Sequence, residues 1–278
     1  MLKLNQNYIK LVVRKALKED INSSGDVTTK LISNNKNITI AKIIAKQNGV
    51  IAGLNFCSYA FKSIDKKARF VAKIKDGAKV KKGQVVALIK AKVGAILTAE
   101  RTALNFLSHT SGIATLTNEF VKKIKLQTKI CCTRKTTPNL RLLEKYAVKV
   151  GGGFNHRFNL SDEIMIKDNH ISFEKNLIKL IKKALKKKKI ITVEVDNIKQ
   201  LKSILGLKFK RILFDNMSLN ALKKCLKLCK NKYETEYSGN VNLKNVRKIA
   251  DTKVNRISIG ALTHSAKAFD FSLELKKT

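Results

Sequence analysis

The chain has 278 residues, of which 44% are hydrophobic, so it can bury a substantial core and is not disordered as a whole. No apolar run approaches the roughly 18 residues of a transmembrane helix. The opening segment carries charges inside its apolar stretch, so we expect no signal peptide, no membrane partner and a cytoplasmic protein. Five scattered cysteines argue against a disulfide framework.

The net charge of +38 suggests nucleic-acid binding, but the distribution of the charge favours another interpretation. Lysines are spread along the whole chain, and only nine of the 58 basic residues are arginines. Four of these, Arg101, Arg134, Arg141 and Arg157, fall within one fifth of the sequence. The densest lysine run, residues 182–189, is typical of the solvated end of a helix. We expect no specific nucleic-acid partner, and a basic nucleic-acid-binding protein is the non-enzyme alternative.

The first part of the chain predicts an α+β unit. An amphipathic helix is expected over residues 7–18. Apolar segments that predict strands follow at residues 38–46, 69–75 and 84–91. Within residues 76–86, Gly77 and Gly83 bracket Val80 and predict a tight hairpin between two short strands. A long helix is expected over residues 98–125, with a broad apolar face that bridges two domains.

The second part shows short apolar strands, each followed by a helical stretch. The predicted strands are residues 163–167, 191–195, 211–215, 234–238 and 256–260. Their polar or small closing residues recur every 21 to 27 positions: Lys167, Glu194, Asp215, Ser238 and Gly260. This spacing predicts consecutive parallel βα units, in a closed barrel or an open doubly wound sheet. A barrel is favoured because no GxGxxG turn follows a first strand. In either fold the closing residues lie at the edge where active sites form.

Basic side chains gather around a triple glycine, Gly151 to Gly153, in the segment from Thr133 to His170. The segment contains Arg134, Lys135, Arg141, His156, Arg157, Lys167 and His170. Arginine suits bidentate recognition of carboxylate or phosphate, and lysine is a mobile charge for the same anions. The segment therefore predicts the anion-binding part of an active site.

Acidic and small residues close the later predicted strands. Glu194 and Asp215 lie at neighbouring strand ends, where carboxylates can hold Mg²⁺ together with substrate phosphate. Asp196 could join them or could cap the following helix. Two short loops expose backbone N–H groups that suit a phosphate: Ser238, Gly239 and Asn240, and Gly260, Ala261, Leu262 and Thr263.

The histidines have different expected roles. His156 lies inside the basic segment and is expected to bind a ligand. His170 could orient the site or be structural. His109 is expected to be a satisfied residue of the long helix, and His264 to begin the last helix.

These motifs resemble the quinolinate phosphoribosyltransferases, which are also called nicotinate-nucleotide pyrophosphorylases. The resemblance covers nearly the whole chain and includes ERTALNFLSHTSGIATLT, TRKTTPNLRLLEKYAVKVGGGFNHR, VEVD, LFDNM and SIGALTHS. It implies an α/β fold with an N-terminal α/β sandwich at residues 1–110, possibly joined by the tail 268–278. A C-terminal incomplete TIM-like α/β barrel would then occupy residues 111–267.

The resemblance also implies an activity. Phosphoribosyl would pass from phosphoribosyl pyrophosphate to quinolinate with decarboxylation. The products would be nicotinate mononucleotide, pyrophosphate and CO₂, in de novo NAD biosynthesis with Mg²⁺ as cofactor. The protein would be a homodimer or a higher oligomer.

The resemblance assigns roles residue by residue. The carboxylates of quinolinate would be held by Arg134, His156, Arg157 and Lys167, with Thr133 beside them, and Arg101 would reach the site across the subunit interface. Lys135 would lie near the phosphoribosyl donor, with Glu194 and Asp215 toward the ribose hydroxyls and Mg²⁺. The residues implied to hold the 5′-phosphate are Ser238, Gly239, Asn240, Gly260, Ala261 and Leu262. The catalytic set would be Lys135, Lys167, Glu194 and Asp215.

The sequence departs from the family pattern at a few positions. Asn139 and Asn240 stand where glycine is common, and Phe154 replaces a small residue after the triple glycine. Asparagine tolerates left-handed backbone, so we expect the loops to form. A relative acting on another carboxylated heterocycle, as in the branch associated with molybdate transport operons, is the enzyme alternative. The complete TRKTTP and NHR motifs favour quinolinate.

Overall fold

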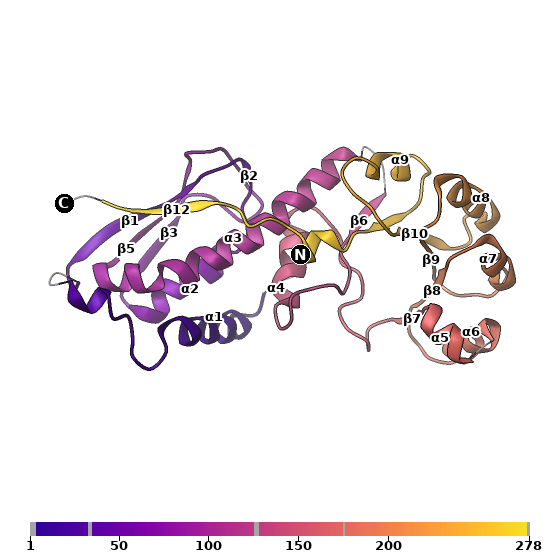
Figure 1. Cartoon of the computed structure of the whole chain (residues 1–278), viewed down its shortest axis with the longest axis horizontal. Helices are drawn as coiled ribbons and strands as arrows, with labels where there is room; N and C mark the ends of the chain where they lie inside the picture. The colour runs from indigo at the N-terminus through magenta and orange to yellow at the C-terminus, as the bar shows by residue number, and fades with distance from the viewer. Residues whose placement is uncertain (1–3, 33–34, 125–127, 175, 277–278) are drawn as a thin grey trace. The chain divides into compact units, whose positions relative to one another are not determined.

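A computed structural model describes residues 4–32, 35–124, 128–174 and 176–276 (Figure 1). The chain forms two compact units. The first comprises residues 1–118, 142–152 and 266–278, and the second comprises residues 119–141 and 153–265. These units divide the chain differently from the domains expected at 1–110 and 111–267, and that domain boundary stays a prediction.

The first unit is built on an antiparallel sheet of four strands in the order β12-β1-β5-β3. The strands are β1 (Ile38–Ala45), β3 (Arg69–Ala72), β5 (Val85–Lys92) and β12 (Phe271–Leu275). The predicted strands in residues 38–91 are confirmed, and the last strand comes from the C-terminal tail. A second, two-stranded sheet pairs β2 (Gly49–Val50) with β4 (Lys79–Val80).

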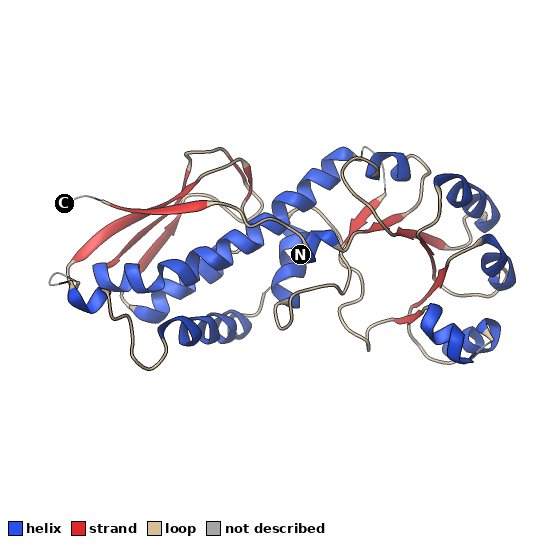
Figure 2. Cartoon of the chain, viewed as in Figure 1, coloured by secondary structure: helices blue, strands red, loops and turns tan. Residues whose placement is uncertain are grey.

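Helices cover this sheet, as the blue ribbons in Figure 2 show. The unit contains α1 (Gln6–Ile21), the short 3₁₀ helix η1 (Thr29–Leu31), α2 (Leu54–Ile64) and most of α3 (Val93–Lys123). Helix α1 buries Ile9, Val13 and Leu17, which share one face at a spacing of four residues. The Asn5 side chain accepts a hydrogen bond from the Asn7 N–H at 2.8 Å and so caps α1. The predicted opening helix and the predicted long helix are both confirmed, although Lys125, the expected last residue of the long helix, lies outside the described residues.

The hairpin predicted within residues 76–86 is wrong. Turns do form at Gly77 and Gly83, which have φ angles of 91° and 86°. However, β4 pairs with β2, whereas β5 pairs with β1 and β3. The two strands therefore belong to different sheets, because each finds a partner that is distant in sequence.

The second unit is built on a parallel sheet of six strands in the order β6-β11-β10-β9-β8-β7. The strands are β6 (Lys129–Cys131), β7 (Ile164–Ile166), β8 (Ile191–Val195), β9 (Arg211–Asp215), β10 (Glu234–Ser238) and β11 (Arg256–Ser258). From β7 to β11 each strand lies beside the next in the chain, so the winding never reverses direction. This is the winding of a barrel and excludes the doubly wound alternative. Strands β6 and β7 are the two edges of the described sheet, so the predicted incomplete α/β barrel is confirmed.

The helices on the outer side of this sheet (Figure 2) are α5 (Asp168–Glu174), α6 (Leu177–Leu185), α7 (Ile198–Ile204), α8 (Leu219–Cys229) and α9 (Val246–Ala250). The short α10 (Ala261–His264) follows β11, and α4 (Arg141–Val150) follows β6 but belongs almost entirely to the first unit. Every residue of β8 is buried, as expected for a parallel strand covered on both faces. The parallel arrangement brings the carboxyl ends of the strands to one edge, where the pocket described below opens.

Among the described residues, no helix combines the length and the apolar character needed to cross a bilayer.

Candidate active site

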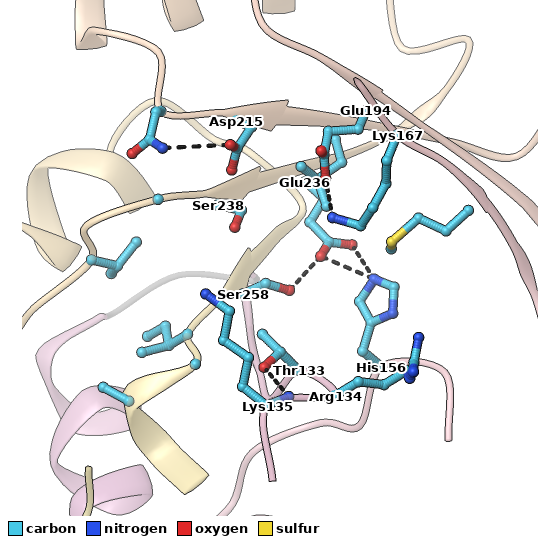
Figure 3. A pocket seen from close by; sticks show the side chains of 18 of the residues that line it. Thr133, Arg134, Lys135, His156, Lys167, Glu194, Asp215, Glu236, Ser238 and Ser258 are labelled. Atoms are coloured by element: carbon cyan, nitrogen blue, oxygen red, sulfur yellow. Dashed lines mark hydrogen bonds and ion pairs between the residues drawn. The ribbon is translucent and has the colours of Figure 1, made fainter. Parts of the chain in front are cut away.

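A pocket of about 760 Å³ opens at the carboxyl edge of the parallel sheet, entirely within the second unit (Figure 3). Its lining consists of Thr133, Arg134, Lys135, His156, Arg157, Met165, Lys167, Glu194, Leu213, Asp215, Asn216, Glu236, Ser238, Gly239, Asn240, Val241, Ser258, Ile259, Gly260, Ala261 and His264. Nearly all residues that the sequence marked as site candidates therefore share one cavity. The separate βα units contribute to it because parallel strands end at a common edge.

Two of the residues to which the resemblance assigned a role do not line this pocket. Leu262 is fully buried in α10. Arg101 lies on α3 in the first unit, and 77% of its side chain is exposed. Neither observation tests the role implied for these residues.

Arg134 and Arg157 place two guanidinium groups in the pocket lining. Burial lowers the pKa of Arg157, and the neighbouring Arg134 charge lowers it further. Within the described part of the chain, Arg134 Nε is buried without a hydrogen-bond partner. A buried donor beside a like charge is costly unless an anion joins it. This side of the pocket is therefore suited to a carboxylate or phosphate ligand.

An ion pair joins Lys167, after β7, to Glu194 on β8. Lys167 Nζ lies 2.7 Å from Glu194 Oε2. Burial raises the pKa of Glu194 above its usual range, and Lys167 opposes this effect. The carboxylates of Asp215 and Asp168 raise the pKa of Glu194 further. Glu194 and Asp215 thus form a pair of interacting carboxylates at neighbouring strand ends.

Left-handed backbone shapes the loops after β9 and β10. Asn216, Gly239 and Asn240 have φ angles of 49°, 107° and 48°. The Asn240 side-chain amide donates to Asn216 Oδ1 at 3.2 Å, which links the two loops. Asn139 is also left-handed, with φ of 64°. The expectation that asparagine can take the place of glycine in these loops is confirmed.

The loop after β6 contacts the loop after β11. Thr263 Oγ1 donates to the Lys135 carbonyl at 2.6 Å, and the Lys135 N–H donates to Thr133 Oγ1 at 3.0 Å. A Cβ atom on Gly260 would lie 3.2 Å from Lys135 Cδ, so this glycine allows the close approach. Lys135 is thereby held next to the backbone of the loop that begins α10.

Two family models match the chain. The model for the N-terminal domain of quinolinate phosphoribosyl transferase matches residues 26–111, and the model for the C-terminal domain matches residues 113–274. The chain belongs to the quinolinate phosphoribosyl transferase family. The resemblance drawn from the motifs, and with it the expectation of an enzyme, is confirmed.

Individual members of the family match over nearly the full length. The probable nicotinate-nucleotide pyrophosphorylase (carboxylating) of Bacillus subtilis strain 168 is 38% identical over 276 residues, covering 98% of this chain and 95% of that protein. Quinolinate phosphoribosyltransferase (decarboxylating) 2b, mitochondrial, of Nicotiana tabacum is also 38% identical, covering 96% of this chain and 82% of that protein. The crystal structure of NadC from Streptococcus pyogenes has a TM-score of 0.95 at 38% identity and covers 99% of both chains.

Of the remaining sequence candidates, His264 lines the pocket, and the others take structural positions. His109 Nε2 lies 2.9 Å from Glu144 Oε1 within the first unit. His170 is exposed on α5 and accepts a hydrogen bond from the Lys167 N–H. Asn197, not Asp196, caps α7 with its side chain. His264 ends α10 instead of beginning it, and it lines the quinolinate phosphoribosyl transferase pocket.

Glu236 is a pocket residue that the sequence analysis missed. It lies on β10, is fully buried and contacts His156 (Figure 3). A charged residue inside an alternating strand usually faces solvent, so the pattern alone did not mark it. A signal was present nonetheless, because the neighbouring strands each begin with an arginine, Arg211 and Arg256, that can pair with it.

The side chains of the pocket are compatible with the metal that the family implies. Among the described residues, no group of three or more His, Cys, Asp or Glu side chains could hold an ion. Glu194 and Asp215 supply a pair of carboxylates in the pocket. A pair is compatible with Mg²⁺, which commonly takes one or two carboxylates and completes its coordination with water and substrate phosphate.

Proposed function

We propose that this enzyme transfers phosphoribosyl from phosphoribosyl pyrophosphate to quinolinate. The products are nicotinate mononucleotide, pyrophosphate and CO₂, and the reaction serves de novo NAD biosynthesis. The names of the relatives support this activity. The observation that carries the proposal is that one pocket combines a pair of guanidinium groups with a carboxylate pair and two short glycine-containing loops.

The guanidinium side of the pocket receives quinolinate. Arg134 and Arg157 pair with its two carboxylates, and the unsatisfied Arg134 Nε gains a partner. His156 and Lys167 complete this subsite, with Thr133 at its edge. Lys167 also pairs with Glu194, one of the two carboxylates of the pocket. Its ammonium group therefore lies between the sites proposed for the two substrates.

The loops on the other side receive the phosphoribosyl donor. Backbone N–H groups of two short segments hold the 5′-phosphate: Ser238, Gly239 and Asn240, and Gly260, Ala261 and Leu262. Lys135, whose backbone is held by Thr263, neutralises charge on the pyrophosphate.

Glu194 and Asp215 are the residues that would hold Mg²⁺, with oxygens of the donor as further ligands. When bound, the ion neutralises charge on the departing pyrophosphate. The raised pKa of Glu194 is consistent with a carboxylate that gains stability when a cation binds.

The chemistry depends on positioning. The C–O bond from the ribose C1′ to pyrophosphate breaks while the quinolinate nitrogen forms a bond to C1′, and the carboxylates of the pocket stabilise the positive charge on the ribose. When the adjacent carboxylate leaves as CO₂, the electron pair of the broken C–C bond stays on the ring carbon, where the neighbouring cationic nitrogen stabilises it, and that pair then takes a proton. Arg134 and Arg157 orient that carboxylate, but tight binding of its ground state would slow its departure.

We also propose a cellular location and an oligomeric state for the enzyme. The enzyme works in the cytoplasm as a homodimer or a higher oligomer, and Arg101 of one subunit reaches the pocket of its partner. Most of the Arg101 side chain is exposed, although it lies 4.0 Å from Glu100 Oε1, so a second subunit could reach it.

A product assay tests this function. Purified protein is mixed with quinolinate, phosphoribosyl pyrophosphate and Mg²⁺, and nicotinate mononucleotide is measured by chromatography. We expect product from quinolinate, none when nicotinic acid replaces it, and loss of product when a chelator removes Mg²⁺. Product from nicotinic acid alone would overturn the substrate, and undiminished product without divalent metal would overturn the assignment of Glu194 and Asp215.

A further inference from the structure

Glu236 is a buried carboxylate on the pocket wall to which the mechanism above assigns no role. Its side chain is fully buried on β10, in the middle of the parallel sheet. Because side chains alternate along a strand, Glu234 points to the same face of the sheet two residues earlier. Both acids therefore face the interior of the second unit.

Two buried arginines from the neighbouring strands hold this pair of acids. Arg211 Nε on β9 lies 2.9 Å from Glu234 Oε2 and 3.6 Å from Glu236 Oε2. Arg256 on β11 places Nη1 3.6 Å from Glu234 Oε1 and Nε 3.3 Å from Glu236 Oε2. The two arginine side chains are only 5% and 9% exposed, so these ion pairs are shielded from water.

The surroundings keep Glu236 ionised. Burial alone would raise its pKa, but the hydrogen bond from His156, the charge of Arg256 and the hydrogen bond from Ser258 outweigh burial and lower the pKa. An ionised carboxylate can only accept hydrogen bonds. Every polar group that faces Glu236 must therefore donate to it.

This requirement determines the protonation of His156. Its Nε2 lies 3.1 Å from both oxygens of Glu236, as the dashed lines in Figure 3 mark, so Nε2 carries a proton. The Arg157 backbone N–H donates to His156 Nδ1 at 2.9 Å, so Nδ1 carries none. The hydrogen-bond pattern thus assigns the neutral Nε2–H tautomer.

Arg157 is held at both ends as a result. His156 accepts from its backbone N–H, and the Arg157 Nη1 group donates to the Glu163 carbonyl at 3.1 Å. The main-chain position from which the Arg157 side chain extends therefore depends on the orientation of the His156 ring, which in turn depends on Glu236.

We propose that Glu236 is a positioning residue for the dicarboxylate subsite: it fixes the tautomer and the orientation of His156 and thereby places Arg157 for the substrate. The identity of that substrate rests on the proposed function, whereas the role of Glu236 within the pocket does not. Glu236 does not touch the substrate and acts through His156.

Substitution Glu236→Gln makes a sharp test because it keeps the shape of the side chain. The amide has one acceptor oxygen, for which the donors Arg211, Arg256 and Ser258 compete, and its NH₂ group then faces His156 Nε2. We expect the Nε2–H tautomer to be lost. Glu234→Gln is the matched control, because Glu234 shares both arginines but bonds to them rather than to His156.

The tautomer is measured by long-range ¹H–¹⁵N NMR correlation of the imidazole rings, with the His156 signals assigned from a His156→Asn sample. We expect the Nε2–H pattern in the wild type and in Glu234→Gln, and its loss in Glu236→Gln. A wild-type His156 that carries its proton on Nδ1, or an unchanged pattern in Glu236→Gln, would overturn the proposal. If Glu236→Gln does not fold, Ser258→Ala removes one donor to Glu236 and must still perturb the His156 signals.

Steady-state kinetics separate positioning from a general structural role. We expect Glu236→Gln to raise the KM for quinolinate about 10- to 100-fold, as removal of a supporting hydrogen bond behind a ligand commonly does. The KM for phosphoribosyl pyrophosphate should change less than about twofold, and Glu234→Gln should change neither constant by more than that. Equal increases in both KM values would contradict the proposal. If quinolinate is not turned over at all, the proposed function fails, and the NMR result alone decides the role of Glu236.

Discussion

At the scale of single residues, the pocket sets like charges beside one another on both of its sides. Arg157 lies beside Arg134, and Glu194 lies near Asp215. Each arrangement is unfavourable in the free protein and becomes favourable when a ligand of opposite charge binds. The repulsion between these like charges therefore favours ligand binding and lowers the stability of the free protein.

Removing the Glu194 charge should stabilise the protein near neutral pH. The folded state raises the pKa of this carboxyl, so its contribution to stability is full below its ordinary pKa of 4.5 and is lost as the pH rises through the folded value. We expect Glu194→Gln to raise Tm relative to wild type near pH 7, by more than it does near pH 4, while activity falls. Thermal unfolding at both pH values measures this difference.

Glu174 provides a control, because its pKa is lowered in the folded state whereas that of Glu194 is raised. Glu174 is partly exposed, and hydrogen bonds from Lys183 and Lys179 lower its pKa. The contribution of Glu174 to the stability of the folded state is present above its ordinary pKa and is lost as the pH falls through the lowered pKa. Glu174→Gln should therefore lower Tm slightly near pH 7 and not near pH 4. A Glu194→Gln protein that follows the same trend would contradict the electrostatic interpretation of the pocket.

Replacing Arg134 should separate binding from stability. We expect Arg134→Ala to weaken quinolinate binding by about 2–4 kcal/mol, roughly 30- to 1,000-fold, because the charged hydrogen bonds are lost. Its Tm should not fall, since the repulsion on Arg157 is relieved. Calorimetric titration with quinolinate and thermal unfolding give the two values. Arg247→Ala, an exposed change on α9, is the control and should alter neither. A large loss of stability in Arg134→Ala would mean that the guanidinium is structural.

At the scale of elements, the loops that line the pocket contain residues with positive φ angles, a left-handed backbone conformation that few residues other than glycine adopt. Gly239 has φ of 107°, and a Cβ atom there would overlap the Asn216 side chain and lie 2.8 Å from the Asn216 backbone nitrogen. Gly206 has a similar φ of 97°, but a Cβ atom there would meet open space. The two glycines therefore separate backbone strain from crowding.

Alanine substitutions at the two glycines should differ in a measurable way. Gly206→Ala should cost about 1–2 kcal/mol in unfolding free energy from backbone strain alone and leave kinetics unchanged. Gly239→Ala should cost more and also raise the KM for phosphoribosyl pyrophosphate, because Asn216 and the linked Asn240 must move. Denaturant unfolding and steady-state kinetics provide the comparison. Equal effects of both substitutions on KM would rule out a role for the loop after β10 in binding the donor.

The elements of the parallel sheet could be predicted from the sequence because local signals determine them. Each strand from β7 to β11 is a short apolar run closed by a polar or small residue, and the regular spacing predicts the βα order. The pairing of β4 with β2 could not be predicted in this way, because a strand of two residues is too short to carry a sequence pattern that indicates which strand it pairs with. The same limit applies to β12, which joins the first sheet from the far end of the chain.

At the scale of the whole molecule, the site could be predicted where chemistry and motif coincide. Arg134 could be predicted because it lies in the basic cluster around the triple glycine, and Lys167 and Asp215 because they close predicted strands, where such residues suggest anion and metal binding. Glu236 was missed because its function depends on partners from three other segments, which only the folded sheet brings together.

The proposed role of Arg101 across a subunit interface can be tested by mixing inactive variants. Arg101→Ala and Arg134→Ala should each be inactive alone. After subunit exchange, half of the dimers are mixed and each has one intact site, so about a quarter of wild-type activity should return. Arg134→Ala mixed with Arg157→Ala is the control, since both lesions lie in the same pocket and no intact site can form. Failure to recover activity despite confirmed exchange would place Arg101 outside the partner's site.

In the proposed reaction, one pocket joins quinolinate to phosphoribosyl and removes a carboxylate. The direct measurement uses quinolinate labelled in the carboxylate next to the ring nitrogen and follows labelled CO₂ together with nicotinate mononucleotide. We predict that both appear in equal amounts, and only when phosphoribosyl pyrophosphate is present. Release of CO₂ without the donor, or consumption of the donor with no labelled CO₂, would contradict this account.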